Sequence, residues 1–187
     1  MMKRLLDIIL VLCSLPLTLP VSFAVAIAVK LESHGPVLYW SDRVGKNNTI
    51  FRMPKFRSMH INSPELAPEV FHDASNYITK VGNFIRHTSL DELPQLWSVL
   101  KGDMSLIGPR PPLYNETYLI NLRTKKGVHV LLPGISGWAQ INGRNNISIE
   151  EKVDFDTYYL HHQSLILDVK IIALTIIKVL KREDIVH

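Results

Sequence analysis

The stretch that decides the fold is SLDELPQLWSVLKGDMSLIGPRPP, residues 89–112. It places an adjacent acidic pair, Asp91-Glu92, one short helix away from a rigid Pro109-Arg110-Pro111 corner. Carboxylates can act as nucleophile, base or metal ligand. An arginine between two prolines presents its planar guanidinium with little freedom to lose, and that group matches phosphate geometry. The stretch therefore indicates phosphate chemistry assisted by a divalent metal.

A purely structural interpretation of the acidic pair competes with this one. Residues 89–92 also read as an S-x-x-E capping box, with Ser89 as N-cap and Glu92 as the third helical residue. Acidic residues are common in a first helical turn because they complement the helix dipole. Only the neighbouring motifs favour a catalytic role for the pair.

Composition limits the class of protein. The 187 residues are enough for one domain, and the net charge of +4 could attract nucleic acid, anionic lipid or a phosphorylated substrate. A single cysteine, Cys13, excludes an intrachain disulfide. Apolar residues are concentrated at the two ends of the chain.

The N-terminal segment from Leu5 to Val29 is almost continuously apolar, and as a straight helix it would reach about 37 Å, enough to span a bilayer. Pro16 and Pro20 fall in its middle, where each removes a helix hydrogen bond. Basic residues at both ends give no inside–outside bias. A signal peptide, a kinked single span and a re-entrant helix all remain open. The re-entrant helix, broken near the prolines and returning to the same membrane face, is favoured.

The rest of the chain predicts a β-hairpin and several helices. The hairpin strands are expected at 37–40 and 49–52, with a turn at 45–48 and Pro54 ending the second strand. A surface loop is expected over 62–76. Helices are expected at 90–100, 113–126, 150–160 and 164–182. The last helix is so apolar that it must be buried or lie at a membrane interface.

Basic residues supply candidates for phosphate recognition. Those near the hairpin and the loops could hold a diphosphate, although such charges are usually solvated. The candidates are Lys55, Arg57, Arg86, Arg110 and Arg144.

Four motifs in order resemble the bacterial sugar transferases of the monotopic phosphoglycosyl transferase superfamily, small-enzyme type. They are PKFRSM (54–59), the stretch 89–112, PGISGWAQINGR (133–144) and LDVKI (167–171). The resemblance runs from about Lys3 to Arg182. It departs at the helix-break pair, Ser-Pro in the family, which reads Leu19-Pro20 here with an additional Pro16.

The resemblance implies a fold and an activity. The fold would be α+β, mainly helical with a β-hairpin, in which 1–31 form a re-entrant membrane helix and 32–187 a compact cytoplasmic catalytic domain with interfacial helices. The activity would be transfer of a phosphosugar from a UDP-sugar to polyprenol phosphate at the bacterial inner membrane, with Mg²⁺ as cofactor. Asp91 would be the nucleophile that forms a covalent phosphosugar intermediate, and Asp91 and Glu92 would be the metal ligands.

Two other functions remain as alternatives. One is a membrane-anchored nucleic-acid-binding protein, which the absence of aromatic interleaving and of a recognised module disfavours, so no nucleic acid is expected. The other is a metal-dependent phosphohydrolase with water as acceptor. Neither the sugar nor the oligomeric state can be inferred from the sequence.

Overall fold

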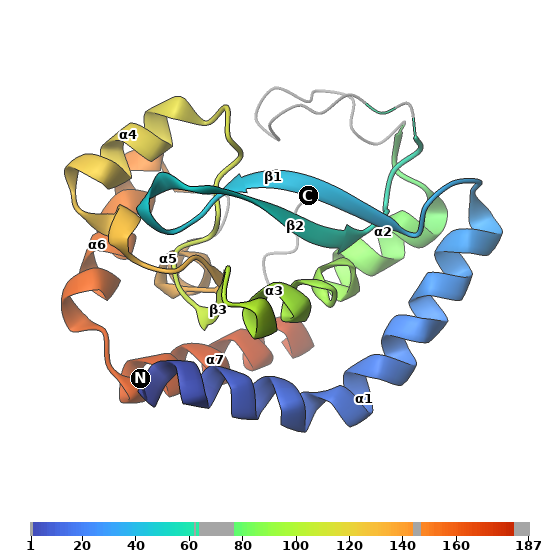
Figure 1. Ribbon diagram of the computed structural model, residues 1–187, viewed down its shortest axis with the longest axis horizontal. Coiled ribbons are helices and arrows are strands. Elements are labelled where there is room, and N and C mark those ends of the chain that lie inside the picture. Colours follow the sequence, from blue (N-terminus) through green and yellow to red (C-terminus); the bar gives the residue numbers. More distant parts are fainter. Residues whose placement is uncertain (1, 62, 64–76, 144–146, 182–187) are drawn as a thin grey trace.

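The computed structural model describes residues 2–61, 63, 77–143 and 147–181. Within these ranges the chain is mostly helical, with one β-hairpin and one short pair of parallel strands (Figure 1). The loop predicted at 62–76, apart from Ser63, and Arg144 lie outside the described residues. The α-helices are α1 Met2–Glu32, α2 Lys80–His87, α3 Gln95–Lys101, α4 Thr117–Lys125, α5 Trp138–Asn142, α6 Ile149–His162 and α7 Leu165–Lys181.

The predicted hairpin is confirmed and is longer than expected. Strands β1 (Leu38–Val44) and β2 (Ile50–Phe56) pair antiparallel. The turn between them uses Asn47 and Asn48 at φ of 55° and 58°, a left-handed region that asparagine tolerates. The prediction that Pro54 ends the second strand is wrong, since Pro54 lies inside β2. Each strand of a two-stranded sheet is an edge, so a residue without an N–H group is tolerated there.

Helix α1 runs without interruption through both of its prolines. The break expected between Pro16 and Pro20 is absent as an interruption of the helix, which extends from Met2 to Glu32. Figure 1 shows instead that α1 changes direction near its middle. A proline inside a helix removes a hydrogen bond and clashes with the preceding turn, which accounts for the bend.

One face of α1 packs against the domain in two places, one in each half of the helix. Its buried residues Asp7, Val11, Val25 and Val29 recur at helical spacing. Val11 contributes to a core cluster with Met53 of β2 and with Val99 and Met104 on and after α3. Val25 and Val29 form a second cluster with Phe56 of β2 and Ile85 of α2. The bent helix therefore packs against β2 at two places, near the middle of the strand and at its end.

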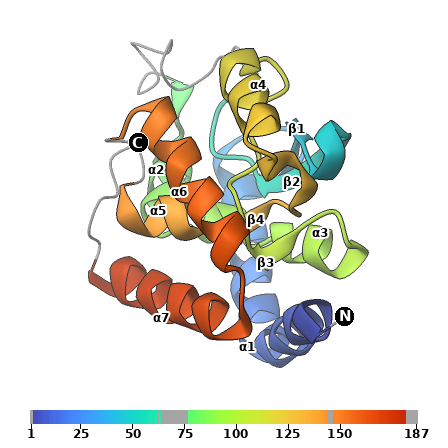
Figure 2. The same cartoon turned by 90° about the vertical axis from the view of Figure 1, so that its left-hand side faces the viewer.

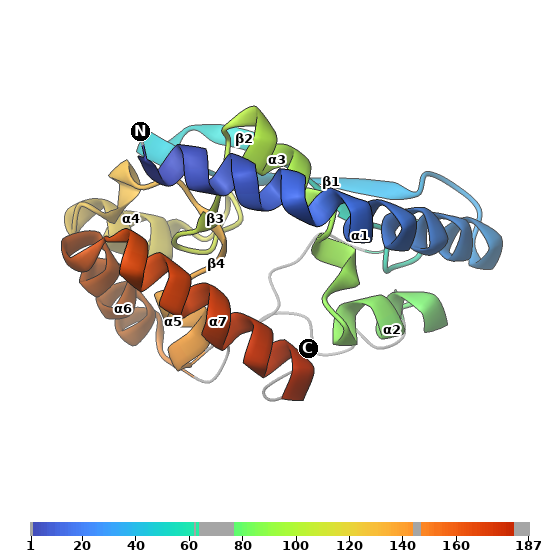
Figure 3. The ribbon, with the colours of Figure 1, turned by 90° about the horizontal axis from the view of Figure 1, so that it is seen from below.

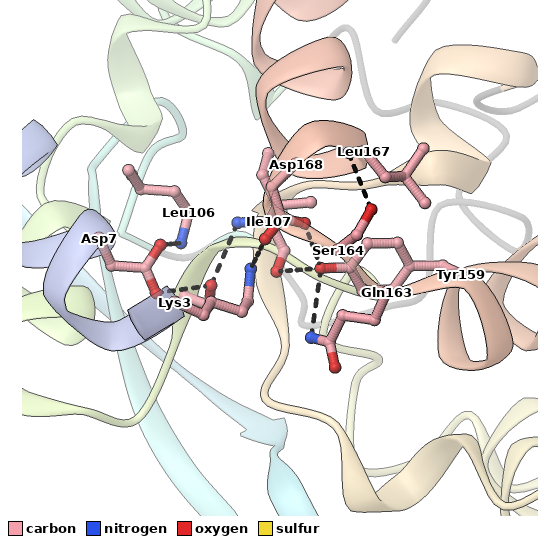
Figure 4. A network of polar contacts seen from close by, with 10 residues as sticks. Lys3, Asp7, Leu106, Ile107, Tyr159, Gln163, Ser164, Leu167 and Asp168 are labelled. Atoms are coloured by element: carbon pink, nitrogen blue, oxygen red, sulfur yellow. Dashed lines mark hydrogen bonds and ion pairs between the residues drawn. The ribbon is translucent and has the colours of Figure 1, made fainter. Parts of the chain in front are cut away.

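Polar contacts fix the start of α1 to distant parts of the chain (Figure 4). Lys3 Nζ lies 2.8 Å from Asp168 Oδ2 on α7, and Tyr159 of α6 donates to the same carboxylate at 2.6 Å. Asp7, only 3% exposed, accepts hydrogen bonds from Ser105 Oγ at 2.8 Å and from the backbone N–H of Leu106 at 3.2 Å. Charges in an apolar helix are costly unless paired, so these contacts require α1 to dock in one register.

Arg4 joins α1 to the end of α3. Its guanidinium donates to the carbonyls of Val99 and Leu100. These belong to the last turn of α3, whose carbonyls have no partner within the helix and favour a cation. Gly102, at φ +102°, ends α3 in the left-handed conformation, as the sequence predicts.

A second layer packs behind the hairpin around two strands of three residues each. Strand β3 (Ser105–Ile107) pairs parallel with β4 (Gly134–Ser136), between α3 and the helices α5, α6 and α7 (Figure 2). The core of this layer consists of Ile107, Ile141, Tyr159 and Ile171.

The other predicted helices are found with shifted ends. Helix α4 begins at Thr117 rather than at 113, because Leu113 forms a β-bridge with Arg43. Helix α6 has a complete capping box between Ser148 and Glu151. Helix α7 matches the expected C-terminal helix.

Candidate active site

The acidic pair lies on a 3₁₀ turn, Leu90–Glu92, that precedes α3. Ser89 has φ 56° and ψ 17°, and its side chain makes no capping hydrogen bond. An N-cap residue needs an extended backbone, so the capping-box interpretation of Ser89 and Glu92 is wrong. The predicted helix over 90–100 is divided at Pro94, which directly precedes α3. The Glu92 carboxylate is thus free of a helix-capping role.

Two cations hold Glu92. Lys55 Nζ lies 2.9 Å and Arg110 Nη2 3.2 Å from the same oxygen, Oε1 of Glu92. Burial opposes ionisation of this carboxyl, but Lys55 and Arg110 outweigh burial and hold its pKa well below the usual range. Glu92 is therefore a fixed anion between two cations.

Asp91 has a different environment from its neighbour. It is 8% exposed, and its nearest cation, Lys55 Nζ, is 3.8 Å from Oδ2. Burial raises the pKa of Asp91, while Lys55 acts in the opposite direction. The negative charge of Asp91 also acts on Arg86, whose pKa is lowered by burial. Asp91 is therefore less tightly paired than Glu92.

The corner that carries Arg110 is held entirely through its carbonyl groups. Three of the four residues in Pro109–Pro112 are prolines and have no N–H to donate. All four carbonyls accept a hydrogen bond; in chain order the donors are Gly134 N (2.9 Å), Arg123 Nη1 (2.8 Å), Arg43 Nη1 (3.2 Å) and Val44 N (3.0 Å). Segments from β1, β4 and α4 therefore converge on this corner and fix the direction of Arg110.

The donor to Arg110 is itself part of a buried ion pair. Arg123 donates through Nε and Nη2 to Asp156 Oδ2 at 2.9 and 2.6 Å, and both residues are buried. The third contact of the guanidinium goes to the Arg110 carbonyl. Asp156 on α6 therefore orients Arg123 on α4, which in turn positions the corner.

The structure brings together some of the predicted site residues and separates one. Lys55 and Arg110 contact Glu92, and Arg86 lies within electrostatic range of Asp91. Arg57 is 7% exposed and donates to the carbonyls of Ser33 and His34 just after α1. The structure thus places Arg57 with the end of α1 and not with the acidic pair.

Two residues that line a recess with Glu92, Arg43 and Gln95, were not among the predicted site residues. The hairpin register could have indicated Arg43. Tyr39 opposes Lys55 and Arg43 opposes Phe51, so Arg43 and Lys55 project from the same face of the sheet. Gln95 is the first residue of α3 and is 3% exposed. It follows the acidic pair closely, but its direction depends on the 3₁₀ turn, which the sequence did not predict.

Only a small acidic donor set is available for a metal. Among the described residues, no group of three or more His, Cys, Asp or Glu side chains is placed to hold an ion. Mg²⁺, however, is commonly bound by one or two carboxylates together with substrate phosphates and water. Both cations contact Oε1 of Glu92, so Oε2 and the Asp91 carboxylate remain as ligands. Asp91 and Glu92 therefore fit Mg²⁺ that arrives with a diphosphate substrate.

Carboxylates held among cations, beside a rigid arginine, are an arrangement that suits phosphoryl transfer. Comparison with known families matches residues 1–182 to the bacterial sugar transferases. The chain belongs to this family.

Three relatives illustrate the match. A UDP-N-acetylgalactosamine-undecaprenyl-phosphate N-acetylgalactosaminephosphotransferase of Aeromonas hydrophila is 42% identical over 93% of this chain and 42% of its own length. A UDP-glucose:undecaprenyl-phosphate glucose-1-phosphate transferase of Escherichia coli (strain K12) is 40% identical over 95% of this chain and 40% of its own length. An uncharacterized sugar transferase, EpsL, of Bacillus subtilis (strain 168) is 42% identical over 98% of this chain and 90% of its own length. The chain thus spans about two-fifths of the first two relatives.

The Arg123–Asp156 pair allows stability and positioning to be separated. We expect Arg123→Met to lower the free energy of unfolding by about 3–5 kcal/mol, because it leaves a buried carboxylate unpaired. The double variant Arg123→Met/Asp156→Leu removes both charges and should recover most of that stability. Its turnover should stay at least about 10-fold reduced, because the Arg110 carbonyl has lost its donor.

Chemical denaturation and steady-state turnover measure the two effects. Asp154→Asn, which breaks an exposed pair on the same helix, is the matched control and should change stability by less than about 1 kcal/mol. Full activity in a stable double variant would show that Arg123 does not position the corner.

Proposed function

We propose that this protein transfers a sugar phosphate from a UDP-sugar to undecaprenyl (polyprenol) phosphate, releasing UMP. The observation that carries the proposal is the pairing of Glu92 with Lys55 and Arg110 directly beside Asp91, which is less tightly paired. The names of the relatives from Aeromonas hydrophila and Escherichia coli supply the substrate classes, a UDP-sugar and undecaprenyl phosphate.

In the first step, an oxygen of Asp91 attacks the phosphorus that carries the sugar. The bond between this phosphorus and the bridging oxygen breaks, and UMP leaves with that oxygen. The products are an aspartyl phosphosugar and UMP. A phosphodiester repels an anionic nucleophile, and Lys55 and Arg110 reduce that repulsion.

In the second step, a phosphate oxygen of the polyprenol phosphate attacks the same phosphorus. The bond to Asp91 breaks, and the carboxylate is regenerated as the polyprenyl diphosphate sugar forms. Mg²⁺, bound by Asp91 and Glu92 with the substrate phosphates, would neutralise phosphate charge. Covalent catalysis lets a water-soluble donor and a membrane-bound acceptor use one site in turn.

An apolar surface supports action at a membrane. Helix α1 is the one helix among the described residues that is long and apolar enough to cross a bilayer. Figure 3 shows α1 and α7 together on one face of the molecule. Large apolar side chains are exposed on both helices: Leu5, Ile9, Leu12, Leu17, Leu19, Phe23, Ile27 and Leu31 on α1, and Ile166, Val169, Ile176 and Ile177 on α7. We propose that this face lies on membrane lipids at the cytoplasmic side of the inner membrane, with α1 re-entrant.

The nucleophile is tested by Asp91→Asn, which preserves size but removes the anionic oxygen. We expect lipid-dependent UMP release from UDP-sugars to fall to background with the melting temperature unchanged. Asp103→Asn, which removes a charge paired with exposed Lys101, should stay near wild-type activity. Near-normal turnover in Asp91→Asn would exclude the assignment, and UMP release by the wild type without lipid would indicate a hydrolase.

The topology is tested by single cysteines at Met2 and His34, introduced in a Cys13→Ser background. Both positions are exposed in the structure, so each should react with a thiol reagent that can reach it. A re-entrant α1 predicts that a membrane-impermeant reagent labels neither cysteine in cells with an intact inner membrane and both after it is opened. Labelling of position 2 alone in intact cells would mean that α1 spans the membrane.

A further inference from the structure

Arg43 is a part-buried cation that forms no ion pair with an acidic residue among those the structure describes. Its guanidinium makes two hydrogen bonds to neutral groups, Ser41 Oγ at 3.0 Å and the Pro111 carbonyl at 3.2 Å. None of the ion pairs among the described residues involves Arg43. Burial, together with the positive charge of Arg110, lowers its pKa to about 10. Such a cation gains most from an anion that binds beside it.

Gln95 presents a second donor without an acceptor. The residue is 3% exposed, and its buried Nε2 has no hydrogen-bond partner. A buried donor left unpaired costs about 1–3 kcal/mol. A ligand that supplies an acceptor to Gln95 Nε2 would remove this cost. This observation is independent of the charge of Arg43.

Both residues line the same small recess. The recess is lined by Arg43, Gln95, Arg110, Glu92 and Gly134, among others. It is too narrow to enclose a water molecule, so a ligand must approach these groups from its mouth. Among its polar groups, Arg43 carries a positive charge that hydrogen-bonds only to neutral groups, and Gln95 has a donor without an acceptor. Arg110, in contrast, is paired with Glu92. The ligand that matches this recess is an anionic oxygen group.

We propose that Arg43 and Gln95 form a second phosphate subsite, which holds the phosphate that leaves with the nucleoside. The inference rests on the proposed phosphosugar transfer. The recess is lined by Glu92 and Arg110 but not by Asp91. The phosphate under attack must lie against Asp91, so the adjoining phosphate of the diphosphate lies at the mouth of the recess.

This subsite would act when the bond to the leaving group breaks. Negative charge then grows on the departing UMP phosphate. Arg43 and Gln95 donate to that phosphate, and donors placed where charge develops favour the transition state. Arg110 remains with Glu92 and the transferred phosphate.

Product inhibition by UMP tests the subsite. We expect Arg43→Gln to raise the inhibition constant of UMP about 10- to 100-fold, as for the loss of a charge-assisted hydrogen bond. Arg43→Lys should give an intermediate inhibition constant, because lysine keeps the positive charge but lacks the paired donors of the planar guanidinium. Gln95→Glu should weaken UMP binding, and so raise its inhibition constant, more than Gln95→Leu does, because a carboxylate repels the phosphate. The matched control is Arg52→Gln on the other face of the hairpin, where Arg52 stacks on Trp40, and it should change the constant less than about twofold.

The outcomes separate this subsite from the function on which it rests. If wild-type protein neither releases UMP from UDP-sugars nor is inhibited by it, the proposed function fails. If Arg43→Gln lowers turnover but leaves UMP inhibition unchanged, Arg43 only positions the corner and the subsite is excluded. If Arg43→Gln does not fold, the Gln95→Leu and Gln95→Glu variants test the subsite in its place. Unchanged UMP inhibition in both would overturn the proposal.

Discussion

The immobilised Pro109–Pro112 corner is the constraint on which the site depends. Because its prolines cannot donate, the corner is ordered only if other segments supply donors to each carbonyl. Those donors come from β1, α4 and β4. The hairpin and the second layer must therefore both be formed for the backbone of Arg110 to be fixed. Arg110 and Lys55 then hold Glu92, and Asp91 is left as the less tightly paired carboxylate. Site geometry is thus a consequence of the assembly of the whole domain.

The docking of α1 adds a second constraint, on the position of the site relative to the apolar face. Lys3, Arg4 and Asp7 each find a partner on a different element, on α7, α3 and β3 respectively. These contacts fix the start of α1, while Val25 and Val29 fix its other half against α2 and β2. The bend between the halves lets one helix follow the domain while its outer face stays apolar. A water-soluble and a lipid-linked substrate could then meet at one fixed position.

Much of the fold could be predicted from the sequence where the signal is local. The hairpin followed from β-prone runs around residues 45–48, and the end of α3 followed from Gly102. Strands β3 and β4 could not be predicted, because three residues carry no periodicity and their partners lie far apart in the chain. The capping box failed because the left-handed backbone of Ser89 cannot be read from residue type. Among the predicted site residues, Lys55 and Arg110 do contact Glu92. Arg57 contacts the end of α1 instead, and that contact depends on how the helix docks, which residue type does not indicate.

In the proposed mechanism, Asp91 becomes covalently linked to the sugar phosphate. Intact protein and its peptides can be measured by mass spectrometry after brief reaction with UDP-N-acetylgalactosamine or UDP-glucose in the absence of polyprenol phosphate. The account predicts a mass increase of one sugar phosphate on the peptide containing Asp91, which disappears when polyprenol phosphate is added. UMP release on addition of polyprenol phosphate, with no adduct on Asp91 under any quench condition, or an adduct on Glu92 instead, would contradict it.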